Sequence, residues 1–222
     1  MLAEGAVRIL QVVRTRSVLL IAIVGLVAFG SAALGDAGAA ARRAVCGPAA
    51  GHTLLADSVA RVYSRHGKVY GCARSGSTSY RLGTTDHSFN EGRAGPIALA
   101  GAEVAYGLTF YGVDTINAEV LVRRLTDGHV RRQHSAINEP VGAEYFETVD
   151  DVVVKSDGSV AWIAHATWIG SQGKTVTEVD KSDRTSKSLL DSSSSIVTNS
   201  LRLHGSALSW KDGSSSRFTT LS

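Results

Sequence analysis

The chain has 222 residues, of which 44% are hydrophobic and 19% charged, a composition that excludes bulk disorder and suffices for a domain with a substantial core. The formal net charge is only +3, and without residues 1–39 the acidic and basic residues nearly balance. A nucleic-acid-binding function is therefore not expected, because it needs a dense basic face.

Residues 1–39 have the pattern of an export leader. Three arginines precede an apolar run over residues 17–34, and Ala-Gly-Ala at 37–39 fits a signal-peptide cleavage site. The run is also nearly long enough for a membrane-spanning helix. We predict an N-terminal hydrophobic helix that is either a cleaved signal peptide or a membrane anchor. In both cases the rest of the chain is predicted to be extracytoplasmic, secreted or anchored by this segment.

The chain contains two cysteines, Cys46 and Cys72. Two cysteines in an exported protein most simply form one disulfide, with two buried free thiols as the alternative. Cys46 lies in a predicted spacer at residues 40–53, so the bridge would tie this spacer onto the first strands of a domain covering residues 54–222.

Residues 54–222 alternate apolar strands with turns, and no stretch after the leader has a clear helical period. Four segments, at 61–83, 96–136, 151–191 and 200–221, share a strand, a turn glycine and a second strand bearing an aromatic residue. The glycines are Gly67, Gly101, Gly158 and Gly205, and the aromatic residues are Tyr70, Tyr106, Trp162 and Trp210. The second and third segments continue into a further hairpin, which predicts four antiparallel strands in each, against about three in the other two.

The clearest hairpin covers residues 151–168 and turns at Asp157-Gly158. Asp-Gly recurs at 127–128 and 212–213, and it favours tight hairpin turns, which need positive φ angles. A repeated four-stranded antiparallel unit of about 40 to 50 residues is typical of a propeller blade.

The run Asp-Gly-Ser-Val-Ala-Trp at 157–162, with weaker versions at 204–210 and 101–106, resembles the blades of exported bacterial β-propeller repeat proteins of the WD-repeat or TolB-like kind. The resemblance implies an all-β fold of antiparallel sheet repeats, propeller-like, with about four blades and the recurring aromatic residue packed between neighbouring blades. Four units are the lower limit for a closed ring, so a partial propeller that pairs with another chain and a β-sandwich remain alternatives.

Motifs for catalysis are missing from the sequence: it has no nucleophile elbow, phosphate-binding loop, dinucleotide fingerprint or zinc-protease motif. The seven histidines are scattered and the Asp-Gly turns lack the ligand alternation of calcium loops, so no cofactor, metal site or catalytic residue is predicted.

Acidic residues gather between the second and third segments, at Glu139, Glu144, Glu147, Asp150 and Asp151. A glycoside hydrolase or lyase needs two carboxyl groups across a cleft, and the last four of these residues are the candidates. The simpler interpretation is a solvated connector.

Arginines occur in pairs on both arms of one hairpin, Arg123-Arg124 and Arg131-Arg132. They form either a cationic patch for anionic lipid or cell-envelope polymer, or a charged edge that keeps the hairpin soluble. The favoured function is a non-catalytic exported domain that binds a protein or cell-envelope partner through its loops. The alternative is the carboxylate-dependent glycoside hydrolase or lyase.

Overall fold

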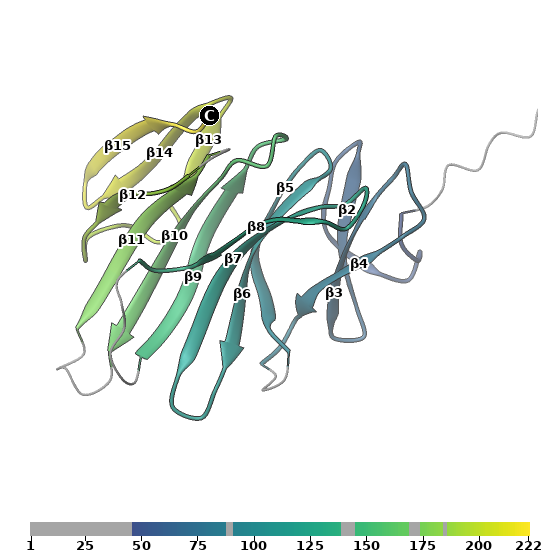
Figure 1. Cartoon of the computed structure of the whole chain (residues 1–222), viewed down its shortest axis with the longest axis horizontal. Coiled ribbons are helices and arrows are strands. Elements are labelled where there is room, and N and C mark those ends of the chain that lie inside the picture. The colour runs from purple at the N-terminus through teal and green to yellow at the C-terminus, as the bar shows by residue number, and fades with distance from the viewer. Residues whose placement is uncertain (1–45, 88–90, 139–144, 169–173, 184–185) are drawn as a thin grey trace, which may run out of the picture. The chain divides into compact units, whose positions relative to one another are not determined.

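The computed structural model describes residues 46–87, 91–138, 145–168, 174–183 and 186–222 (Figure 1). The predicted leader lies outside these residues. The described part is all-β and mostly antiparallel, as predicted, and it belongs to a compact unit that spans residues 41–222. No helix in the described ranges is long and apolar enough to cross a membrane.

The strands form four antiparallel units in chain order, and within each unit consecutive strands pair with one another. The first unit contains β1 (His52–Ala56), β2 (Ala60–Arg65), β3 (Lys68–Ala73) and β4 (Tyr80–Thr84). The second contains β5 (Arg93–Ala100), β6 (Glu103–Tyr111), β7 (Ile116–Arg124) and β8 (Val130–Ser135). The third contains β9 (Tyr145–Val154), β10 (Val160–Trp168), β11 (Thr175–Ser182) and β12 (Lys187–Ser192). The fourth contains β13 (Arg202–His204), β14 (Ala207–Asp212) and β15 (Ser215–Thr220).

The first three units belong to one 12-stranded hydrogen-bonded sheet, and the fourth is a separate three-stranded sheet. The links within the large sheet are slight. One parallel residue pair, Thr84 with Arg93, joins β4 to β5, and another, Ile116 with Phe146, joins β7 to β9. The antiparallel unit is therefore the repeating element. The first strands of the second and third units, β5 and β9, contact each other directly.

Each inner unit buries both of its faces, because successive side chains on a strand point to opposite sides. On β6, Tyr106 packs in a cluster with the first unit and Ala105 in a cluster with the third. On β10, Trp162 joins the cluster shared with the second unit and Ile163 the cluster shared with the fourth. Three hydrophobic clusters thus lie between successive units.

Three of the four recurring aromatic residues lie between neighbouring units, as predicted. Tyr106, Trp162 and Trp210 are 1%, 0% and 5% exposed, each in the cluster shared with the preceding unit. Tyr70 differs, because in the described part of the chain no unit precedes its own. It packs instead against a small cluster of Cys46, Tyr63 and Cys72 on the outer face of the first unit.

The first unit has four strands rather than about three, since β1 begins at His52, inside the predicted spacer. All five residues of β1 are exposed, so this strand lacks the alternation of buried and exposed positions that reveals a strand in a sequence. The fourth unit has three strands, as predicted.

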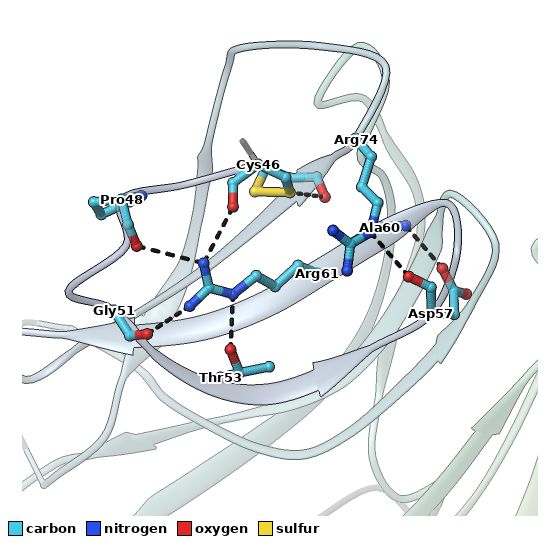
Figure 2. The surroundings of a disulfide bond; sticks show 9 residues. Cys46, Pro48, Gly51, Thr53, Asp57, Ala60, Arg61 and Arg74 are labelled. Atoms are coloured by element: carbon cyan, nitrogen blue, oxygen red, sulfur yellow. Dashed lines mark hydrogen bonds between the residues drawn. A yellow bond between two sulfur atoms is a disulfide. The ribbon is translucent and has the colours of Figure 1, made fainter. Parts of the chain in front are cut away.

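Cys46 and Cys72 form the predicted disulfide, with their Cα atoms 5.6 Å apart (Figure 2). Arg61 on β2 holds the same segment down. Its guanidinium donates to the carbonyl oxygens of Cys46 (3.3 Å), Pro48 (3.4 Å) and Gly51 and to the hydroxyl of Thr53 (2.9 Å). The segment before β1 is therefore attached to the first unit both covalently and by hydrogen bonds.

Removing the disulfide with the double substitution Cys46→Ala and Cys72→Ala is expected to lower the free energy of unfolding. The bridge closes a loop with a sequence separation of 26. Loop-closure entropy for such a loop corresponds to about 3 kcal/mol. Urea unfolding of the variant and of the oxidised wild type measures the difference. Equal midpoints and slopes would show that the bridge contributes nothing to stability.

Candidate ligand-binding cleft

An open cleft of about 640 Å³ lies where the β7–β8 hairpin meets the turn between β9 and β10. The second unit contributes the ends of three strands, and the third unit contributes the turn. The lining residues are Glu103, Arg124, Arg131, Arg132, Ser156 and Asp157. We refer to it as the arginine cleft.

Arg124 reaches the arginine cleft from the end of β7, and a bulge in the β7–β8 pair adds two arginines from β8. Arg132 pairs with Val122 while Val130 pairs with Arg123, so Arg131 is the extra residue on β8. The bulge brings two consecutive arginines, Arg131 and Arg132, to one cleft, which strict alternation would forbid.

Arg123 does not belong to this group. Arg123 and Arg124 are neighbours on β7, so their side chains point to opposite faces of the sheet. Arg123 borders a different pocket, beside Tyr106 and Leu121, and its guanidinium donates to the carbonyl oxygen of Gly128 (2.6 Å). The four arginines of the sequence pattern therefore do not form a single patch.

Glu103 is the central anion of the arginine cleft. Its Oε1 atom lies 3.2 Å from Nε of Arg124 and 3.4 Å from Nη1 of Arg131. The residue is 3% exposed, and burial raises its pKa above the usual range although the hydrogen bond from Arg124 opposes the shift. Within the described part of the chain, its buried Oε2 atom accepts no hydrogen bond.

Backbone carbonyls of the β9–β10 turn orient two of the arginines. Arg131 donates from Nη1 to the oxygen of Asp157 (3.0 Å), and Arg132 donates from Nε to the oxygen of Gly158 (2.9 Å). The side chains of Arg124 and Arg131 remain 34% and 33% exposed. Guanidinium groups fixed in this way and still open to solvent suit the binding of an anionic group.

Two of the acidic residues proposed for catalysis, Glu147 and Asp151, do not share one site. On β9, Glu147 is 3% exposed, and its Oε2 atom accepts a hydrogen bond from the backbone N–H of Ala118 in the second unit (3.0 Å). Asp151 accepts one from the N–H of Leu201, beside the fourth unit (3.0 Å). The two carboxylates therefore lie on opposite faces of the third unit. Because Glu147 is buried, the interpretation of this acidic stretch as a solvated connector is wrong for Glu147.

Asp150 lies between them at a bulge in the β9–β10 pair, because Asp151 pairs with Ile163 and Val149 with Ala164. Its Oδ2 atom lies 2.7 Å from Nδ1 of His165, and this hydrogen bond raises the pKa of the imidazole. The remaining candidate, Glu144, lies outside the described residues, as does Glu139 of the same acidic cluster.

A second group of carboxylates is buried between the second and third units and has no counterpart in the sequence predictions. Glu178 on β11 accepts hydrogen bonds from the backbone and side-chain N–H groups of Asn138 (2.8 and 2.9 Å). Asp180, also on β11, accepts one from the Asn138 amide (2.6 Å). Burial raises the pKa of Asp180 to about 7. We refer to Glu178 and Asp180, which are 1% and 0% exposed, as the buried polar layer; their donor Asn138 is itself exposed.

Sequence reasoning missed the buried polar layer because its pattern is misleading. Glu178 and Asp180 alternate with Val179 along β11, which normally indicates that the acidic side chains face water. Only the packing of the second unit against this face buries them.

No group of three or more histidine, cysteine or acidic side chains is placed to hold a metal ion within the ranges that the structure describes. No protein-family model matches the chain, and no curated protein shows significant similarity to it.

Proposed function

We propose that this protein is an exported, non-catalytic domain with a β-propeller-like scaffold, and that it binds a component of the cell envelope in the arginine cleft. The observation that carries the proposal is the cleft itself, in which Arg124, Arg131 and Arg132 converge on one open space. Arginine is enriched among residues that dominate binding energy, because its planar fork of donors binds with little further loss of freedom.

The repeated units support a propeller-like scaffold. Antiparallel units that follow one another in the chain and bury apolar residues between them have the organisation of propeller blades. The segment from Cys46 covers the outer face of the first unit.

Export is supported by two independent features of the chain. The leader pattern of residues 1–39 is the first, and the Cys46–Cys72 disulfide, which favours an oxidising compartment, is the second.

The alternative, a glycoside hydrolase or lyase, has less support. Its mechanism needs two carboxyl groups facing one substrate. Glu147 and Asp151 bind backbone N–H groups on opposite faces of the third unit, so these two do not form such a pair.

Co-sedimentation with isolated cell envelope tests the proposed function. The full chain is expected to sediment with envelope from its native host, and Arg131→Gln with Arg132→Gln is expected to weaken binding about tenfold or more, because each arginine brings several donors. The matched control is Arg93→Gln, an exposed arginine at the opposite end of the β5–β6 pair from Glu103. Failure of the wild type to sediment, or equal losses in both variants, would contradict the proposal.

A further inference from the structure

We infer that the arginine cleft binds a phosphate group of an anionic envelope polymer, and that Glu103 is the internal competitor that this phosphate displaces. The inference rests on the proposed function and names the chemistry of the same site.

The number and direction of the arginines favour a phosphate over a carboxylate. One guanidinium already satisfies a planar carboxylate through two parallel hydrogen bonds. Three guanidiniums around one cleft, from the end of β7 and from two positions on β8, suit a tetrahedral anion whose oxygens point in several directions.

Glu103 holds these arginines only weakly. Its distances to Arg124 and Arg131, 3.2 and 3.4 Å, exceed the 2.7 to 2.9 Å that is usual for charge-assisted hydrogen bonds. Both contacts converge on Oε1, while Oε2 is buried and, in the described part of the chain, has no donor. A ligand anion that offers each guanidinium its own oxygen would bind both arginines better than Glu103 does.

The β9–β10 turn keeps the cleft in a binding-ready form. Gly158 has a φ of +86°, and a Cβ atom there would lie 3.3 Å from Nη1 of Arg131 and 3.7 Å from Oε2 of Glu103. Glycine therefore allows the turn to approach the charged groups and present its carbonyl oxygens to Arg131 and Arg132. The guanidiniums are oriented before a ligand arrives, which lowers the entropic cost of binding.

Charge also favours an anion. With Glu103 and Asp157 ionised, the three arginines leave the lining residues with a net positive charge. Two charged neighbours offset each other: Oδ2 of Asp127 lies 3.4 Å from Nη1 of Arg124, and Nζ of Lys155 lies 3.8 Å from Oδ2 of Asp157. Replacing Glu103 by a neutral group of the same shape removes a negative charge that repels the ligand. At an effective dielectric constant near 20, removing such a charge a few ångströms from the ligand is expected to strengthen binding about tenfold or more.

The test is a titration of the full chain with inorganic phosphate at low ionic strength, followed by NMR of the arginine Nε–H groups. We expect shifts at Arg124, Arg131 and Arg132 and none at Arg93. The variant Glu103→Gln is expected to bind phosphate about tenfold more tightly, and Arg131→Gln about tenfold more weakly. If Glu103 only supports the fold, Glu103→Gln would weaken binding instead, and that result, or an unchanged affinity, would overturn the inference.

Two further measurements identify the source of the phosphate and keep the test valid if one variant misfolds. Soluble poly(glycerol phosphate) is expected to bind the wild type more tightly than phosphatidylglycerol vesicles do, and the reverse order would overturn the assignment to a polymer. If Glu103→Gln loses the dispersed spectrum of a folded protein, the phosphate titration of Arg131→Gln replaces it as the test. Binding of phosphate by Arg131→Gln with the affinity of the wild type would overturn the inference. Envelope binding that depends on Arg131 and Arg132 but shows no phosphate response would contradict this inference alone and leave the proposed function standing.

Discussion

Replacing Trp162 with alanine is expected to lower the free energy of unfolding by about 4 kcal/mol, the range measured for deletion of a large aromatic side chain from a core. Trp162 is 0% exposed in the cluster between the second and third units, and its indole N–H donates to the carbonyl oxygen of Ala136 (2.8 Å). His134 stacks on the ring with a centroid distance of 5.7 Å, and the Lys187 ammonium lies 5.3 Å from the ring centroid. The substitution removes all these contacts and leaves the Ala136 carbonyl without its donor.

Urea unfolding followed by circular dichroism measures the loss. Trp162→Phe is the matched variant, because it keeps an aromatic ring and removes only the indole N–H and part of the volume. We expect it to cost less than half as much as Trp162→Ala. A loss below about 1 kcal/mol for Trp162→Ala would contradict the account of Trp162 as the residue that packs the second unit against the third.

Stability is expected to fall as the pH rises from 4 to 8, with Asp180 as the main cause. Burial, opposed by the hydrogen bond from Asn138, raises the pKa of this carboxyl from 3.8 to about 7. The folded protein therefore binds a proton in the pH range where the unfolded chain has released it. The resulting stabilisation is complete below pH 4 and is lost as the pH rises toward 7, by up to about 4 kcal/mol.

The variant Asp180→Asn tests this pH dependence, since asparagine is uncharged and nearly the same shape. Its stability is expected to match that of the wild type near pH 4 and to exceed it at pH 8 by up to about 4 kcal/mol. Comparison with the wild type cancels other titrations, including that of His134, whose pKa burial lowers and which therefore favours the folded state at higher pH. Asp114→Asn, in the exposed β6–β7 turn, is the control. Parallel stability curves for wild type and Asp180→Asn would contradict the assignment.

The repeat could be predicted from the sequence because its signals are local. Gly158 predicts a turn through the backbone angle it permits, and it has a φ of +86°. Trp162 and Trp210 follow turn glycines at similar spacing and occupy equivalent places between units. These turns and aromatic positions can be recognised from a few neighbouring residues, so their prediction does not require knowledge of the fold.

The features that sequence reasoning missed depend on contacts between distant segments. Arg131 enters the arginine cleft because of a bulge in β8, which shifts by one residue the alternation of side chains between the two faces of the sheet. The two Arg-Arg pairs in the sequence do not reveal this bulge. Asp180 is buried because the second unit covers β11, although the strand pattern assigns its side chain to water. Tyr70 has the spacing of the other aromatic residues but packs near the disulfide, because it lies in the first unit.

Photocrosslinking in intact cells tests the central claim, that the arginine cleft is the binding site, most directly. A photoreactive amino acid replaces Ser156, which lines the cleft, or Ser216, an exposed residue on β15 of the fourth unit. We expect the probe at position 156 to yield a specific adduct with an envelope component and the probe at position 216 to yield none. Arg131→Gln with Arg132→Gln is expected to abolish the adduct at position 156. An adduct from position 216 alone, or one from position 156 that persists without the two arginines, would contradict this claim.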